Sequence, residues 1–161
     1  MGFRHSSIVV TLCGAALCAC GQQATVDQAV LRAAEAALKS DLRGYVMAQE
    51  SYYLSSGQYM NAASRLSEFV EFSPTHTVRV HSVSPSMGHS AIAYHDSLPQ
   101  LVCAVFLGSE TAPLDDGAAV GQPTCKQFTT VLACAEGHAY PALTGYNFCP
   151  MHGLELVPEE R

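Results

Sequence analysis

The segment VDQAVLRAAEAALKSDLRGYVMAQESYYL, residues 26–54, decides the fold of this chain. Apolar side chains recur along it close to the 3.6-residue period of an α-helix, at Val30, Ala34, Ala37, Leu38, Leu42, Tyr45, Val46, Tyr52 and Tyr53. At its start, Thr25 and Gln28 have the spacing of a capping box, which satisfies free backbone donors at the beginning of a helix. The pattern predicts one long amphipathic helix from near Val26 to about Leu54.

The residues that follow this helix predict β-strands. Residues 75–83 and 90–95 alternate apolar and polar side chains, and residues 101–107 form a continuous apolar run. Short turns separate the three segments, so an antiparallel meander is the simplest arrangement. Residues 108–122 are rich in Gly, Pro, Ala and Asp and predict a loop. We therefore expect an α+β fold with the long helix packed on an antiparallel β-meander.

The tail beyond this sheet contains two potential pairs of metal ligands. Cys134 and His138 form the first pair, and Cys149 and His152 form the second. Two thiolates and two imidazoles satisfy a tetrahedral zinc ion, and the tail has too few apolar residues to fold alone. Because four protein ligands leave no position for water, such a zinc would be structural. The alternative is a disulfide between Cys134 and Cys149, which leaves both histidines idle.

The second of these pairs also resembles part of a known family. The run Phe148-Cys149-Pro150-Met151-His152-Gly153, followed by Leu154-Glu155-Leu156, is similar to the second knuckle of a zinc ribbon. The first pair departs from that family's pattern, because Gly137 stands where the second cysteine would be and only His138 can substitute. The resemblance implies that residues 131–161 form a small β-hairpin, closed by zinc or by the disulfide.

At the other end of the chain, the first residues have the features of an export signal. Arg4 supplies a positive charge, and the apolar stretch from Ile8 to Ala19 covers about 12 residues. Since a helix needs roughly 20 apolar residues to cross a bilayer, a permanent span is disfavoured. We expect residues 1–19 to be removed as a signal peptide.

The end of this stretch, Leu17-Cys18-Ala19-Cys20, resembles the lipobox of bacterial lipoproteins. The resemblance implies cleavage before Cys20, lipidation of Cys20, and a short tether over residues 20–24 that holds the domain on a membrane. By similarity to enterobacterial sorting, Gly21 in place of an aspartate implies the outer membrane. The alternatives are an ordinary signal peptide cut near Ala19 and a prepilin leader cut between Gly2 and Phe3.

An exported chain meets an oxidising compartment, where disulfides form and persist. Cys103 and Cys125 bracket the predicted loop of residues 108–122. We therefore expect a disulfide between these two cysteines.

Several motifs in the predicted helix, in the strands and in the segment between them resemble the globular part of type IV pilins and pseudopilins. They are LKSDLR at 38–43, AQESYY at 48–53, GQY at 57–59, FSP at 72–74 and AIAYH at 91–95. The resemblance implies a pilin-like α+β domain over residues 25–130. Pilins polymerise through an N-terminal apolar helix half of about 25 residues, which this chain lacks. We therefore keep a minor pilin or pseudopilin as the alternative hypothesis.

Charge and motifs limit the remaining function classes. The chain has 161 residues and a net charge of -6, and its 8 Lys and Arg residues are scattered, which argues against nucleic acid as a partner. It contains no G-x-S-x-G elbow, phosphate-binding glycine loop or H-E-x-x-H motif. The residues of a triad occur in His95-Asp96-Ser97, but neighbours on a strand do not converge. We expect a non-enzymatic envelope protein that binds an unidentified envelope partner.

The histidines of the predicted strands form a last pattern. Alternation could place His81, His89 and His95 on one face of the sheet. With no carboxylate or cysteine interleaved, we interpret them as part of a solvated polar face rather than a metal site.

Overall fold

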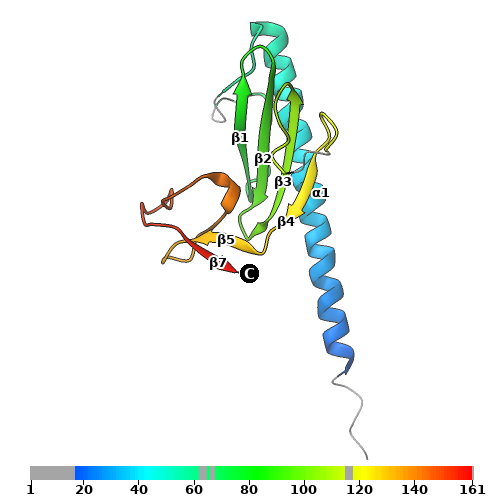
Figure 1. Ribbon diagram of the computed structural model, residues 1–161. Helices are drawn as coiled ribbons and strands as arrows, with labels where there is room; N and C mark the ends of the chain where they lie inside the picture. Colours follow the sequence, from blue (N-terminus) through cyan, green and yellow to red (C-terminus); the bar gives the residue numbers. More distant parts are fainter. Residues whose placement is uncertain (1–16, 62–64, 66–67, 115–117, 161) are drawn as a thin grey trace, which may run out of the picture. The chain divides into compact units, whose positions relative to one another are not determined.

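The computed structural model describes residues 17–61, 65, 68–114 and 118–160, with side chains from residue 28 onward. The expected α+β class is confirmed (Figure 1). The elements are α1 (Leu17–Ser56), β1 (His76–Ser84), β2 (Gly88–His95), β3 (Leu98–Gly108), β4 (Thr124–Gln127), β5 (Thr130–Ala133), β6 (Ala139–Pro141), the short 3-10 helix η2 (Ala142–Thr144) and β7 (Val157–Glu160). Two sheets result, one ordered β1-β2-β3-β4 and one ordered β6-β5-β7.

The chain divides into two compact units, residues 1–32 and residues 33–161. All the strands belong to the second unit, together with α1 from residue 33 onward. No helix in the described part of the chain combines the length and the apolar character needed to cross a membrane.

Helix α1 begins earlier than the sequence predicted. It starts at Leu17, so the predicted start near Val26 is wrong, and Thr25 lies inside the helix instead of capping it. A capping residue needs a non-helical backbone, and the Ala and Gln residues that precede Thr25 favour continuation of the helix. The backbone of the predicted tether, residues 20–24, is part of α1. Residues 1–16 and the side chain of Cys20 lie outside the described residues.

From residue 33 onward, α1 packs against the first two strands. Leu38, Leu42 and Tyr45 are fully buried and recur at the helical period. The Tyr45 hydroxyl donates to the Ser90 carbonyl oxygen on β2 (3.5 Å), and His76 Nδ1 on β1 lies 2.5 Å from an Asp41 carboxylate oxygen. This segment of α1 therefore covers one face of the larger sheet (Figure 1).

The larger sheet is the predicted antiparallel meander. Its strands β1, β2 and β3 pair antiparallel in sequence order, as expected from the alternating segments. Strand β2 is buried on both faces. On the face away from α1, Ile92, Val102 and Ala104 pack against Leu114, Phe128 and Leu143. Because Leu143 belongs to η2, the C-terminal segment forms the second cover of the sheet.

Strand β4 returns alongside β3 and brings the two cysteines of the predicted disulfide together. Cys103 and Cys125 are register partners, and their sulfurs lie 1.96 Å apart in a disulfide that spans 22 residues. In residues 109–114 and 118–123, the described parts of the connection between β3 and β4, the chain forms no strand or helix.

Candidate metal centre

The smaller sheet carries two tight turns that face each other. The first turn, residues 134–138, connects β5 to β6 directly. The second turn, residues 149–154, is flanked by an isolated bridge between Phe148 and Glu155. Strand β7 then pairs with β5, so the sheet has three strands where the sequence predicted a two-stranded hairpin.

Backbone hydrogen bonds give the two turns related shapes. In the first, the Gly137 N–H donates to the Cys134 carbonyl oxygen (2.9 Å), and the Cys134 N–H donates to the His138 carbonyl oxygen (2.9 Å). In the second, the His152 N–H donates to the Cys149 carbonyl oxygen (3.3 Å), and the Cys149 N–H donates to the Leu154 carbonyl oxygen (2.7 Å). The hydrogen bond from the cysteine N–H therefore closes the first turn at the fourth residue after the cysteine, and the second turn at the fifth.

The shorter first turn accounts for the glycine that stands where the zinc-ribbon pattern has its second cysteine. Gly137 has φ 85°, a left-handed conformation that side chains disfavour, and it occupies the place of the second ligand. His138 follows directly, and its imidazole is the second potential donor of this turn.

The two turns bring four donor side chains together. The ligand atoms of Cys134, His138, Cys149 and His152 all lie within 4.8 Å of one another. Cys134 Sγ is 3.9 Å from His138 Nδ1, and Cys149 Sγ is 4.0 Å from His152 Nδ1. In a tetrahedral zinc site, bond lengths of about 2.0 Å to nitrogen and about 2.3 Å to sulfur place the ligand atoms roughly 3.3–3.8 Å apart. A small inward movement of the side chains therefore suffices to close this group around one ion.

The cysteines form the buried side of the group. Cys134, Cys149 and Leu156 make one buried cluster, against which Leu132, Tyr140 and Tyr146 pack, while His138 and His152 are exposed. The four potential ligands thus lie beside a small apolar cluster.

The surroundings of Cys149 favour its thiolate. Burial raises the pKa of this thiol, but hydrogen bonds from Tyr140 and from the backbone of Met151 and His152 lower it more, and the result is a pKa of about 6. The Tyr140 hydroxyl lies 3.5 Å from Cys149 Sγ. Since the thiolate is the form that binds a metal, these donors prepare Cys149 as a ligand. The sequence did not single out Tyr140, because it approaches Cys149 through the fold and not through a motif.

The disulfide alternative has a different geometry from the one observed. Both Cys134 and Cys149 are free thiols, whereas a disulfide requires sulfurs about 2.05 Å apart. The sulfurs are nevertheless close enough to one another and to both imidazoles to form a single donor set. That closeness keeps oxidation to a disulfide as the competing outcome in any test of the site.

Contacts with β1 fix the tail on the larger sheet. An Arg79 side-chain N–H donates to the Thr144 carbonyl oxygen (2.5 Å), and the Arg79 guanidinium lies over the Tyr146 ring, 4.2 Å from its centroid. Contacts of this kind stabilise most when they are shielded from water. The segment between the two turns is thereby held against the face of the sheet opposite α1.

The strand histidines do not form the expected solvated face. His89 is 0% exposed and lies between the rings of Tyr45 and Tyr59, with centroid separations of 5.2 and 4.6 Å. A β-bulge between Val80 and Ser82 interrupts the alternation on which the expectation relied. The interpretation of these histidines as one solvated face is therefore wrong.

The side chains of His95, Asp96 and Ser97 do not form a catalytic triad. The Ser97 backbone N–H donates to His95 Nδ1 (3.0 Å), whereas the Asp96 carboxylate accepts from Thr77 Oγ1 (3.1 Å). A triad needs the carboxylate and the hydroxyl on opposite sides of the imidazole. The contacts of these three residues are instead those of the turn between β2 and β3.

Comparisons with protein-family models and with curated protein sequences find no match for this chain.

Proposed function

We propose that this protein is an exported, lipid-anchored, non-catalytic domain whose C-terminal tail binds one structural zinc ion. The observation that carries the proposal is the convergence of Cys134, His138, Cys149 and His152 within 4.8 Å. Two sulfur and two nitrogen donors are a common set for structural zinc. Four protein ligands fill a tetrahedral ion and leave no open position for water or substrate, so the ion would hold the tail in shape rather than catalyse a reaction.

Metal analysis of protein purified without reductant tests the zinc site. We expect about one zinc per chain, and we expect its loss in His152→Ala. The matched control is His81→Ala, which removes an exposed histidine outside the group and should leave the zinc content unchanged. A metal-free protein with a bridge between Cys134 and Cys149 would refute the site.

The anchor rests on the lipobox that ends at Cys20. Acyl chains contribute about 0.8 kcal/mol per buried methylene, so the two or three chains of a lipoprotein hold a protein firmly on a bilayer. We expect Cys20→Ala to abolish retention on membranes after a salt wash. Cys18→Ala is the matched control, because a small residue at that position keeps the lipobox intact. If Cys20→Ala still sediments with membranes, the anchor is wrong.

A minor pilin or pseudopilin is the second candidate. The observation in its favour is that α1 continues without interruption from Leu17 to Ser56 and packs on an antiparallel meander, an arrangement similar to pilins. Mass spectrometry of the mature N-terminus separates the candidates. An acylated Cys20 supports the lipoprotein, and a methylated Phe3 supports the pilin.

A further inference from the structure

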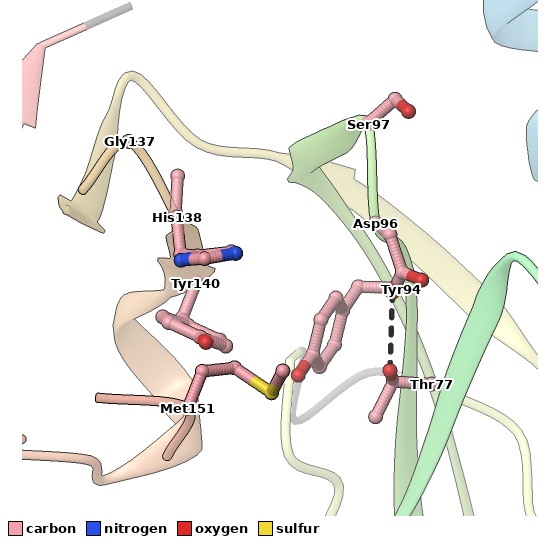
Figure 2. Close-up of a pocket in the computed structure, with 9 residues that line it drawn as sticks. Thr77, Tyr94, Asp96, Ser97, Gly137, His138, Tyr140 and Met151 are labelled. Carbon is pink, nitrogen blue, oxygen red and sulfur yellow. Dashed lines mark hydrogen bonds between the residues drawn. The ribbon is translucent and has the colours of Figure 1, made fainter. Parts of the chain in front are cut away.

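A cavity of about 490 Å³ opens between the larger sheet and the first metal-ligand turn (Figure 2). One of its lining residues, Tyr140, also contacts Cys149 Sγ through its hydroxyl (3.5 Å). Its lining from the larger sheet comprises Thr77, Tyr94, Asp96 and Ser97, and its lining from the tail comprises Gly137, His138, Ala139, Tyr140 and Met151. Nothing in the proposed zinc-binding role uses the residues on the sheet side.

Aromatic rings and a thioether dominate the inner walls of this cavity. Figure 2 shows the rings of Tyr94, His138 and Tyr140 and the side chain of Met151 turned toward the same space. Tyr94 is 3% exposed, so its ring is held in place by packing and only a small part of its surface borders the cavity. The faces of aromatic rings carry partial negative charge and attract cations.

The lining of the cavity carries one carboxylate, and the Arg79 guanidinium, which acts on Tyr94, lies outside the lining. Asp96 is the only carboxylate in the lining, and the lining contains no Lys or Arg. Thr77 Oγ1 donates to one oxygen of this carboxylate at 3.1 Å, which holds the group at the edge of the cavity (Figure 2). The chain as a whole has a net charge of -6, so the surrounding potential also favours a cation.

We propose that this cavity binds a quaternary ammonium group, with Tyr94 and Tyr140 against its methyl groups and Asp96 as its counter-charge. An anion would be repelled by Asp96. An inorganic cation would lose its hydration shell against rings and a thioether, whereas a quaternary ammonium has little hydration to lose. The chemistry is that of a choline head, either as a free solute or as part of a phospholipid.

Choline is the probe for this proposal, and its neutral isostere 3,3-dimethyl-1-butanol is the control ligand. Binding to the full chain is followed by the NMR signals of the tyrosine rings. We expect saturable binding of choline in the millimolar range, with the neutral isostere at least about fivefold weaker, because only the cation gains from the rings and from Asp96. Equal binding of the two ligands would overturn the proposal, as would the absence of saturable choline binding.

Two variants test the sheet side of the cavity without touching the metal ligands. Asp96→Asn should weaken choline binding roughly fivefold, since it removes an exposed charge and keeps the shape. Glu71→Gln, which neutralises an exposed carboxylate outside the cavity, should leave it unchanged. Tyr94→Phe should retain binding, because the ring and not the hydroxyl supplies the contact. Unchanged choline binding in Asp96→Asn would contradict the assignment.

A soluble short-chain phosphatidylcholine distinguishes the source of the group. If it competes with choline and binds more tightly, the natural ligand is a lipid headgroup, and if it competes less well than choline, the ligand is a free solute. The matched phosphatidylglycerol should not compete, and competition by it would overturn the recognition of a cation. Because the variants lie on the larger sheet, failure of this proposal leaves the zinc content of the protein unaffected.

Discussion

At the scale of single residues, Gly137 and His138 determine which donor atoms the first turn brings to the candidate metal centre. A backbone with φ 85° accepts glycine readily, and a ligand at this position would carry the strain of a left-handed side chain. The chain places its second ligand one residue later, where β6 is about to begin. One residue thus changes a two-cysteine knuckle into a Cys-His pair.

The backbone of the first turn can be tested with Gly137→Ala. The added methyl meets no neighbouring atom, so the effect should come from the strained φ alone, about 1 kcal/mol or more. We expect zinc affinity, measured by competition with a chromophoric chelator, to fall by roughly fivefold or more. Gly57→Ala imposes the same kind of strain at φ 72° at the end of α1 and should leave zinc affinity unchanged. Equal affinities for Gly137→Ala and the parent protein would show that the turn does not control the site.

His89 is the second residue whose environment has measurable consequences. Among the described residues neither of its ring nitrogens has a hydrogen-bond partner, and Nε2 lies 3.9 Å from a Glu50 carboxylate oxygen. Burial lowers the pKa of His89 to about 4, and the charge of Glu110 only partly opposes this effect. The imidazole is therefore a neutral core group at pH 7.

The depressed pKa of His89 predicts a loss of stability in mild acid. The unfolded chain takes up a proton near the ordinary value of 6.5, whereas the folded chain does so only near 4. Between these values the unfolded state binds more protons, so the free energy of unfolding falls as the pH falls. Below pH 4 this contribution is already lost.

Urea unfolding at several pH values measures this contribution against His89→Leu, which packs a similar volume and cannot titrate. The parent protein should lose stability relative to the variant between pH 6.5 and 4. A difference between the two proteins that stays constant from pH 7 to pH 4 would contradict the account.

At the scale of elements, the disulfide joins β3 to β4 and lowers the conformational entropy of the unfolded chain. In the chain-entropy model, closing the 22-residue segment stabilises the fold by about 3 kcal/mol. We expect reduction to lower the melting temperature of the protein. Double replacement of Cys103 and Cys125 by Ala should lower it similarly, whereas His81→Ala should not. Finding both thiols open to alkylation in native protein would sink this prediction.

Strands were more predictable than helix ends because their signal is distributed over many residues. Alternation in residues 75–83 and 90–95 identified β1 and β2 within a few positions. The helix start depended on the spacing of Thr25 and Gln28 alone, and a helix passes through that spacing when the preceding residues are good helix formers. Strand β7 escaped notice because Val157-Pro158-Glu159-Glu160 is polar and contains a proline, which an edge strand tolerates.

At the scale of the whole molecule, the second cover of the sheet could not be read from the sequence. Continuous burial of β2 depends on Leu114, Phe128 and Leu143, which come from three separate segments. For the same reason the cavity beside Tyr94 was not foreseen, because its walls come from the sheet and from the tail. The grouping of the four candidate ligands was foreseen because their spacing of four and three residues within each pair already implies two facing turns.

X-ray absorption at the zinc edge of the native protein tests the central claim most directly, because it reports the atoms bound to the metal. Ligation by Cys134, His138, Cys149 and His152 predicts two sulfurs at about 2.3 Å and two nitrogens at about 2.0 Å around a four-coordinate ion. A first shell of only nitrogen and oxygen, or a protein that holds no zinc and carries a Cys134–Cys149 bridge, would contradict it.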